Sequence, residues 1–267
     1  MADCREQVYS DEFFDFIVSY EETNEQTIAG ACIQRIDEGY DIFYYPREGL
    51  PPLNVGSYSY SEIPKCYGLL DQTALEVSGI LKMQNQPVLA LKGRGVLIGF
   101  IDTGIDYTNP AFRYSDGSSR IVRIWDQTIQ DGTSPVGILY GAEYTREQIN
   151  AALLSENPYD LVPSRDRNGH GTFLAGVACG SESENGDFIG AAPQSEIIMV
   201  KLKEAKQYLR DFFFVKDGVP AYQENDIMMA VSYLNGVANI LNRPLVICVA
   251  LGNSAGSHAS EGFLPSY

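Results

Sequence analysis

The amino-acid sequence predicts an α/β protein with a mostly parallel sheet, preceded by a small α+β module. Strand-like and helix-like segments alternate from residue 96 onward, as they do where helices cross between parallel strands. Several strand-like segments are continuous apolar runs, which is typical of strands buried on both faces. An extended stretch rich in Gly, Pro and Ser divides the chain into an N-terminal module, 1–60, and a main domain, 61–267.

Three strand-like segments define the N-terminal module. They are rich in aromatic and β-branched residues and cover 13–20, 27–33 and 40–45. The main domain has four further strand-like segments of mainly apolar character. These strands are predicted at 96–102, 121–126, 196–202 and 245–251.

The predicted helices of the main domain are placed by their capping residues. A short helix is expected at 74–80, with Asp71 as its candidate cap. Thr145 and Gln148 form a capping-box pattern, which predicts a helix over 145–154. Two more helices are predicted, one beginning at His170 and one over 227–241 with Asp226 as its cap.

Composition restricts the function classes. The 267 residues carry a formal net charge of -16 and are 45% apolar, which predicts a sizeable core and argues against nucleic acid or an anionic membrane as partner. No apolar run is long enough to cross a bilayer. The first twenty residues lack a basic region followed by an apolar run, so we expect no Sec-type signal peptide.

The cysteines argue against a disulfide framework and against a zinc site, because their number is odd, their spacing is irregular and no CxxC occurs. Two of them, Cys179 and Cys248, lie in apolar runs and are expected to be small buried hydrophobes. The pattern favours a reducing compartment. The five cysteines are Cys4, Cys32, Cys66, Cys179 and Cys248.

Two residue types point to nucleophilic catalysis. Asp102 ends an apolar strand, the position at which open α/β sheets place ligand chemistry, although an acid there also serves to cap a turn. His170 lies between two glycines at the start of a helix; a lone histidine is more often structural, but flanking glycines permit close approach to the ring. Together the two residues are two members of a triad in which an Asp orients a His and the His accepts a proton from a hydroxyl.

Four segments resemble the motifs of subtilisin-like serine proteases, in the expected order. Residues 101–106 resemble the Asp motif, and residues 168–176 resemble the His motif. Residues 190–193 resemble the loop that follows it. Residues 250–252 resemble the strand that lines the first substrate pocket. The match covers roughly residues 62–257.

This resemblance implies a subtilisin-like three-layer domain that cleaves protein or peptide substrates. Asp102 would orient the histidine, and His170 would act as general base and then general acid. The strand formed by Ala250, Leu251 and Gly252 would bind substrate. No cofactor and no catalytic metal are implied. A structural Ca²⁺ is a weaker alternative, for which the candidate ligands, more simply read as solvated acids, are Asp106, Asp116, Asp126 and Asp131.

The closest resemblance is to the clostridial Csp-type germination proteases. The long insertion between Trp125 and Asn168 and the small N-terminal module are similar in both. By this resemblance, residues 1–60 are a prodomain that assists folding and can stay bound after self-cleavage, with the cut near 57–61. A cytoplasmic or spore-associated location is expected.

The sequence departs from the family at two points. Phe173 stands where secreted subtilisins usually carry a second His, which is not the base. The Gly-Thr-Ser motif with the nucleophile and the oxyanion Asn do not occur after Gly252, so we expect both beyond residue 267 and expect residues 1–267 alone to be inactive and poorly stable. Residues 132–134 read Gly-Thr-Ser, but they lie between the Asp and His motifs. Other weak substitutes are Asn253, Ser254, Ser257 and His258.

Two functions remain open at this stage. The first is a serine endopeptidase of the subtilisin type. The alternative is an inactive subtilisin-like pseudoprotease that acts as a binding or regulatory module. Intact Asp and His motifs favour the enzyme, because a chain under no catalytic demand tends to lose one of them.

Overall fold

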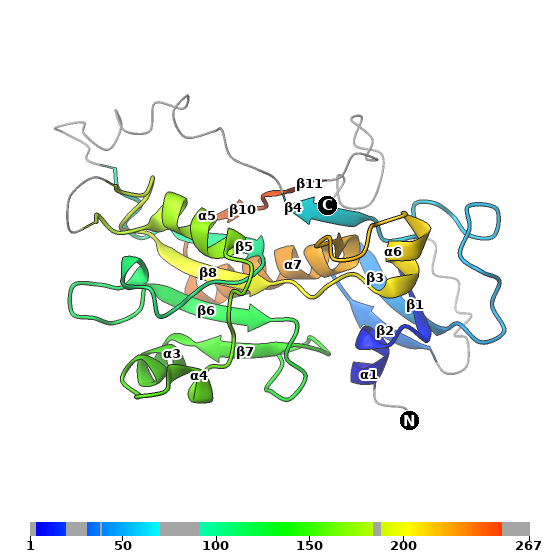
Figure 1. Ribbon diagram of the computed structural model, residues 1–267, viewed down its shortest axis with the longest axis horizontal. Coiled ribbons are helices and arrows are strands. Elements are labelled where there is room, and N and C mark those ends of the chain that lie inside the picture. Colours follow the sequence, from blue (N-terminus) through cyan, green and yellow to red (C-terminus); the bar gives the residue numbers. More distant parts are fainter. Residues whose placement is uncertain (1–3, 20–30, 38, 70–90, 184–187, 253–267) are drawn as a thin grey trace.

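A computed structural model describes residues 4–19, 31–37, 39–69, 91–183 and 188–252. Its main domain is built on a five-stranded sheet in the order β10-β5-β8-β6-β7 (Figure 1). The first four of these strands are parallel and β7 pairs antiparallel with β6, so the predicted mostly parallel sheet is confirmed. The strands are β10 (Leu245–Cys248), β5 (Leu97–Asp102), β8 (Glu196–Lys201), β6 (Ile121–Asp126) and β7 (Ala142–Thr145).

Helices cover both faces of this sheet and make three layers. The long helix α7 (Glu224–Leu241) packs on one face, and α5 (His170–Cys179) and α3 (Arg146–Leu153) pack on the other. Strand residues alternate between these cores, because successive side chains of a strand point to opposite faces. In β5, Leu97 and Ile101 contact the α7 side, whereas Ile98 and Phe100 contact the α5 side.

The remaining elements are short. The connections carry a 3-10 turn (Pro110–Phe112), α4 (Pro158–Leu161) and α6 (Gln207–Phe212). A second small sheet has the order β11-β4-β9 and joins β11 (Leu251–Gly252), β4 (Cys66–Leu69) and β9 (Tyr222–Gln223). In the described part of the chain, no helix combines the length and the apolar composition that a membrane span requires.

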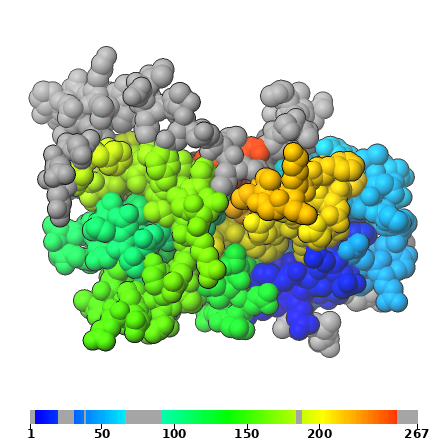
Figure 2. Space-filling model, viewed as in Figure 1, coloured from blue at the N-terminus to red at the C-terminus, as the bar shows by residue number. Residues whose placement is uncertain are grey.

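The N-terminal module consists of one helix and a three-stranded antiparallel sheet in the order β1-β3-β2. It contains α1 (Cys4–Tyr9), β1 (Phe13–Ser19), β2 (Cys32–Arg35) and β3 (Tyr40–Pro46). The predicted first and third strands are confirmed within a residue or two. The second spans Cys32–Arg35, and residues 27–30 of its predicted range lie outside the described residues. The module packs directly against the main domain (Figure 2).

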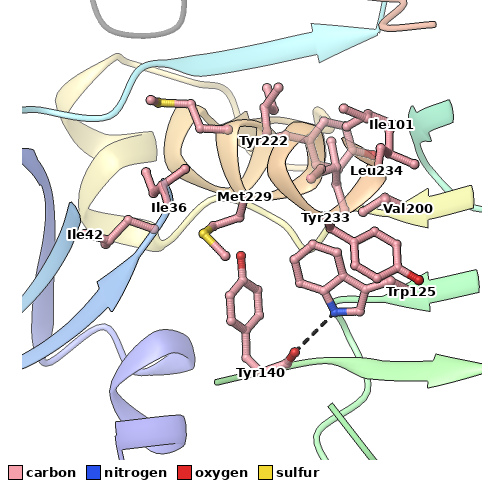
Figure 3. Close-up of a cluster of buried hydrophobic side chains, with 14 of the residues drawn as sticks. Ile36, Ile42, Ile101, Trp125, Tyr140, Val200, Tyr222, Met229, Tyr233 and Leu234 are labelled. Atoms are coloured by element: carbon pink, nitrogen blue, oxygen red, sulfur yellow. Dashed lines mark hydrogen bonds between the residues drawn. The ribbon is translucent and has the colours of Figure 1, made fainter. Parts of the chain in front are cut away.

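The core is continuous across the boundary between the module and the main domain. Ile36 and Ile42 of the module belong to the same buried cluster as Met229 of α7 and Trp125 of β6 (Figure 3). The indole Nε1 of Trp125 donates a hydrogen bond of 3.2 Å to the carbonyl of Tyr140. Since burial of one apolar side chain is worth about 1.5–3 kcal/mol, this shared core stabilises the module on the domain.

Local capping signals gave one confirmed and one wrong prediction. Thr145 and Gln148 do form a capping box at α3, with Gln148 N to Thr145 Oγ1 at 3.4 Å and Thr145 N to Gln148 Oε1 at 2.8 Å. Asp226 does not cap α7, which begins two residues earlier at Glu224. Its buried carboxylate instead binds Lys203 and Tyr140. The predicted helix 74–80 lies outside the described residues.

The argument against disulfides is wrong for one pair. Cys4 of α1 and Cys32 of β2 form a disulfide across the N-terminal module, with a Cα–Cα distance of 5.7 Å. The two residues are 28 positions apart in sequence, so no local pattern reveals the pair. Cys66, Cys179 and Cys248 are free. Cys179 is buried as expected, whereas the predicted burial of Cys248 is wrong: it is half-buried, because β10 is the edge strand of the sheet.

Burial predicts that the free thiols are unreactive. It raises the pKa of Cys66 to about 12 and that of Cys179 to about 11, and it also raises the pKa of Cys248. At pH 8 almost none of Cys66 or Cys179 is in the thiolate form, and the thiolate is the nucleophile. We expect no alkylation of the native protein by iodoacetamide, alkylation of these three residues in denaturant, and alkylation of all five cysteines after reduction. Peptide mass spectrometry counts the adducts, and labelling of Cys4 or Cys32 without reduction would contradict the disulfide.

Candidate active site

Asp102 is the last residue of β5 and its side chain is only 1% exposed. The chain then turns through Gly104, whose φ of 116° is a conformation that L side chains rarely adopt. The backbone N–H of Thr103 donates to Asp102 Oδ1 at 2.7 Å. The strand and turn together hold the carboxylate at the C-terminal edge of the sheet, as the sequence predicted.

His170 is the first residue of α5, and its ring meets this carboxylate. Nδ1 of His170 lies 2.9 Å from Asp102 Oδ1 and 3.0 Å from Oδ2. The residue after the histidine, Gly171, must be glycine, because a Cβ there would lie 2.2 Å from the carbonyl oxygen of Gly104. The His motif therefore needs glycine at this position to bring helix α5 close enough to β5 for the two side chains to bond.

Burial dominates the electrostatics of Asp102. It raises the pKa of this carboxyl group above its ordinary value, and the hydrogen bonds from His170 and Thr103 partly offset the increase. The His170 side chain is 17% exposed, whereas that of Asp102 is 1% exposed. Solvent therefore reaches part of the histidine ring but not the carboxylate. A buried carboxylate that fixes one ring nitrogen leaves the other nitrogen to exchange protons with a reacting group.

The predicted substrate strand is only partly a strand. Leu251 and Gly252 form β11, whereas Ala250 precedes it and lies between β10 and β11. β11 pairs antiparallel with β4, with Leu251 opposite Leu69 and Gly252 opposite Gly68. β4 is not predicted from the sequence, because only four residues form it and both of its partner strands are distant in the chain.

The other edge of β4 pairs with β9, where Tyr67 lies opposite Tyr222. Burial raises the pKa of Tyr222, and the charge of Asp102 adds to that increase. β4 therefore lies between β9 and β11 and is antiparallel to both. A segment of the N-terminal part of the chain thus lies along the strand that was expected to bind substrate.

Other predicted candidates are not brought to this pair in the described residues. The hydroxyl of Ser134 donates to the carbonyl of Gly141 at 3.0 Å, in the connection between β6 and β7. Asp106, Asp116 and Asp126 each accept hydrogen bonds in a turn of their own. Within the described ranges, no three His, Cys, Asp or Glu side chains are grouped as metal ligands would be. The candidates Asn253, Ser254, Ser257 and His258 lie outside those ranges.

The fold is that of the subtilases. A family model described as "Subtilase family" matches residues 93–262, and the chain belongs to this family. The structure is similar to that of the CspB protease of Clostridium perfringens, with a TM-score of 0.58 and 34% identity over 70% of this chain and 35% of that one.

Curated relatives carry names of the same kind. The Arabidopsis thaliana subtilisin-like protease SBT2.2 is 28% identical over 41% of this chain and 15% of its own length. The major intracellular serine protease of Bacillus subtilis is 22% identical over 68% of this chain and 50% of its own length. The chain therefore spans half or less of the length of each of these relatives.

Proposed function

We propose that this chain forms the Asp- and His-bearing part of a serine endopeptidase of the subtilisin type. The observation that carries the proposal is the bond between His170 Nδ1 and Asp102, on the strand and helix that the family motifs occupy. Asp102 holds the ring in one tautomer and stabilises the imidazolium. His170 takes the proton from a serine hydroxyl and later gives it to the leaving amine.

The serine and the oxyanion asparagine belong, in this proposal, to sequence that follows residue 267. The alternative is an inactive module that only binds a partner. The natural protein, expressed from its complete reading frame, distinguishes the two by whether it cleaves protein. We expect that protein to cleave a denatured protein substrate such as casein. Absence of cleavage by the correctly folded natural protein would favour the binding module.

We further propose that the N-terminal module is the chain's own prodomain and that β4 occupies the place of substrate. Support comes from the position of β4 between β11 and β9, paired antiparallel with both. A substrate that adds a strand to β11 would form the same backbone pairing. The name of the Bacillus subtilis relative, an intracellular serine protease, supports a cytoplasmic site of action.

This arrangement favours a cut after Leu69 rather than near 57–61. Ile63 is fully buried, and the backbone N–H of Lys65 donates to Glu224 at 3.0 Å, so the chain is held in place between 61 and β4. In the antiparallel register, Leu69 lies opposite Leu251 and the following residue would come opposite Ala250. The bond to be cut should therefore lie within a few residues after Leu69.

N-terminal sequencing of the natural protein tests this proposal. We expect a new N-terminus a few residues beyond Leu69 and a single uncut chain in a His170→Ala variant. A new N-terminus between residues 57 and 61 would contradict the position of the cut. Processing that persists in the His170→Ala variant would contradict self-cleavage.

A further inference from the structure

One carboxylate outside the Asp–His pair, that of Asp166, accepts hydrogen bonds from the segments that follow Asp102 and surround His170. Asp166 Oδ1 accepts hydrogen bonds from Thr103 Oγ1 at 2.9 Å, Gly169 N at 2.9 Å and Asn168 N at 3.2 Å. Its Oδ2 accepts from Thr172 N at 2.9 Å and from Thr172 Oγ1 at 2.6 Å. Five donors from two separate segments of the chain thus converge on one side chain.

These donors belong to the immediate neighbours of the pair. Thr103 follows Asp102 and donates its own N–H to that carboxylate, while its hydroxyl accepts from Gly171 N at 2.9 Å. Thr172 lies two residues after His170 in the first turn of α5. Asp166 therefore links the turn after β5 to the start of α5.

Helix α5 needs such a partner. Its N-cap position is Gly169, which has no side chain to accept the first N–H groups of the helix. Asp166 supplies that acceptor to Thr172 N, and its negative charge lies at the helix end where a carboxylate is favourable. The same carboxylate also holds Thr103, so the helix cannot shift without straining the turn that carries Asp102.

We propose that Asp166 is a positioning residue that sets the distance and angle between His170 and Asp102. The proposal rests on the function proposed above for that pair. A carboxylate is required because both oxygens act only as acceptors; an asparagine would keep Oδ1 but place a donor opposite Thr172 N. A misplacement of about 1 Å in such a site costs on the order of a hundredfold in rate.

The test uses the natural protein with ¹⁵N-labelled histidine rings, with the His170 signal assigned by comparison with a His170→Gln variant. In the wild type we expect a downfield Nδ1–H resonance from the bond to Asp102. Asp166→Ala should broaden or abolish it and lower kcat by about tenfold to a hundredfold with little change in KM. For Asp166→Asn, the Nδ1–H signal and kcat should lie between those of the wild type and those of Asp166→Ala. An Nδ1–H resonance and kcat unchanged in Asp166→Ala would overturn the proposal.

Three further variants keep the test decisive. Asp116→Asn is the matched control, because Asp116 makes the same kind of turn with Ser118, at 2.9 and 2.6 Å, but is not bonded to the site. If Asp166→Ala does not fold, Thr103→Val removes the hydroxyl that donates to Asp166 and accepts from Gly171 N, and Thr103→Ser, which keeps a hydroxyl there, should restore both readouts. A Thr103→Val variant identical to wild type would overturn the proposal. The NMR readout does not depend on peptidase activity, so a failure of the proposed function is distinguishable from a failure of the Asp166 proposal.

Discussion

Replacement of His170 by alanine is expected to lower kcat of the natural protein by about 10⁶-fold, the loss that follows removal of the histidine from such a triad. The reason is that the His170 ring, which Asp102 holds through Nδ1, is the group proposed to carry the proton. Asp102→Asn is expected to cost less, about 10⁴-fold, because the ring stays in place but adopts the wrong tautomer. Initial rates on a casein or peptide substrate measure both.

The control for this experiment is His258→Ala, which changes the only other histidine of the 267 residues. Its kcat should match that of the wild type. A His170→Ala variant that keeps a tenth or more of the wild-type rate would contradict the role of His170. Equal and negligible rates in wild type and variant would instead favour the pseudoprotease.

Asp15→Ala is expected to lower the free energy of unfolding by about 3–5 kcal/mol, because it leaves a buried cation without its carboxylate. Asp15 of β1 forms an ion pair with Lys206 of the main domain, and both side chains are 3% exposed or less. Its other oxygen accepts from Gln223 Nε2 at 2.8 Å and from Asn225 Nδ2 at 3.3 Å. The variant would also remove the carboxylate oxygen that accepts from these two amides.

Urea unfolding followed by circular dichroism measures this difference. Glu204→Gln is the matched control, because Glu204 pairs with Arg210 in the same segment of the main domain but is 63% exposed. Exposed pairs contribute about 0–1 kcal/mol, so the control should unfold close to the wild type. Equal losses in the two variants would show that the buried contact does not hold the N-terminal module on the domain.

The elements that the sequence predicted well are those with a local signal. β5, β6 and β8 are apolar runs whose burial needs no knowledge of their partners, and the α3 capping box is complete within four residues. β4 and β7 escaped prediction because each is four residues long and forms only by pairing with another strand. Asp226 has the residue type of a cap, yet its contacts are with residues far away in sequence.

The residues of the candidate site also divide into those with a local sequence signal and those without one. Asp102 and His170 lie in motifs whose glycines have a direct structural reason, the close approach of Gly171 to Gly104. Asp166 carries no such mark in the sequence. The one available signal was an acid four residues before His170 and six before Thr172, and its meaning depends on Thr103, which is 63 residues away. A carboxylate shared by two distant segments becomes visible only in three dimensions.

Active-site labelling with a fluorophosphonate probe tests the central claim most directly. We expect the natural protein to form one adduct, on a serine in a Gly-Thr-Ser motif after residue 267, and expect His170→Ala to abolish it because the hydroxyl is no longer activated. Peptide mass spectrometry locates the adduct. An adduct on Ser134, or one that forms equally in the His170→Ala variant, would contradict the assignment of Asp102 and His170 as two members of a serine triad.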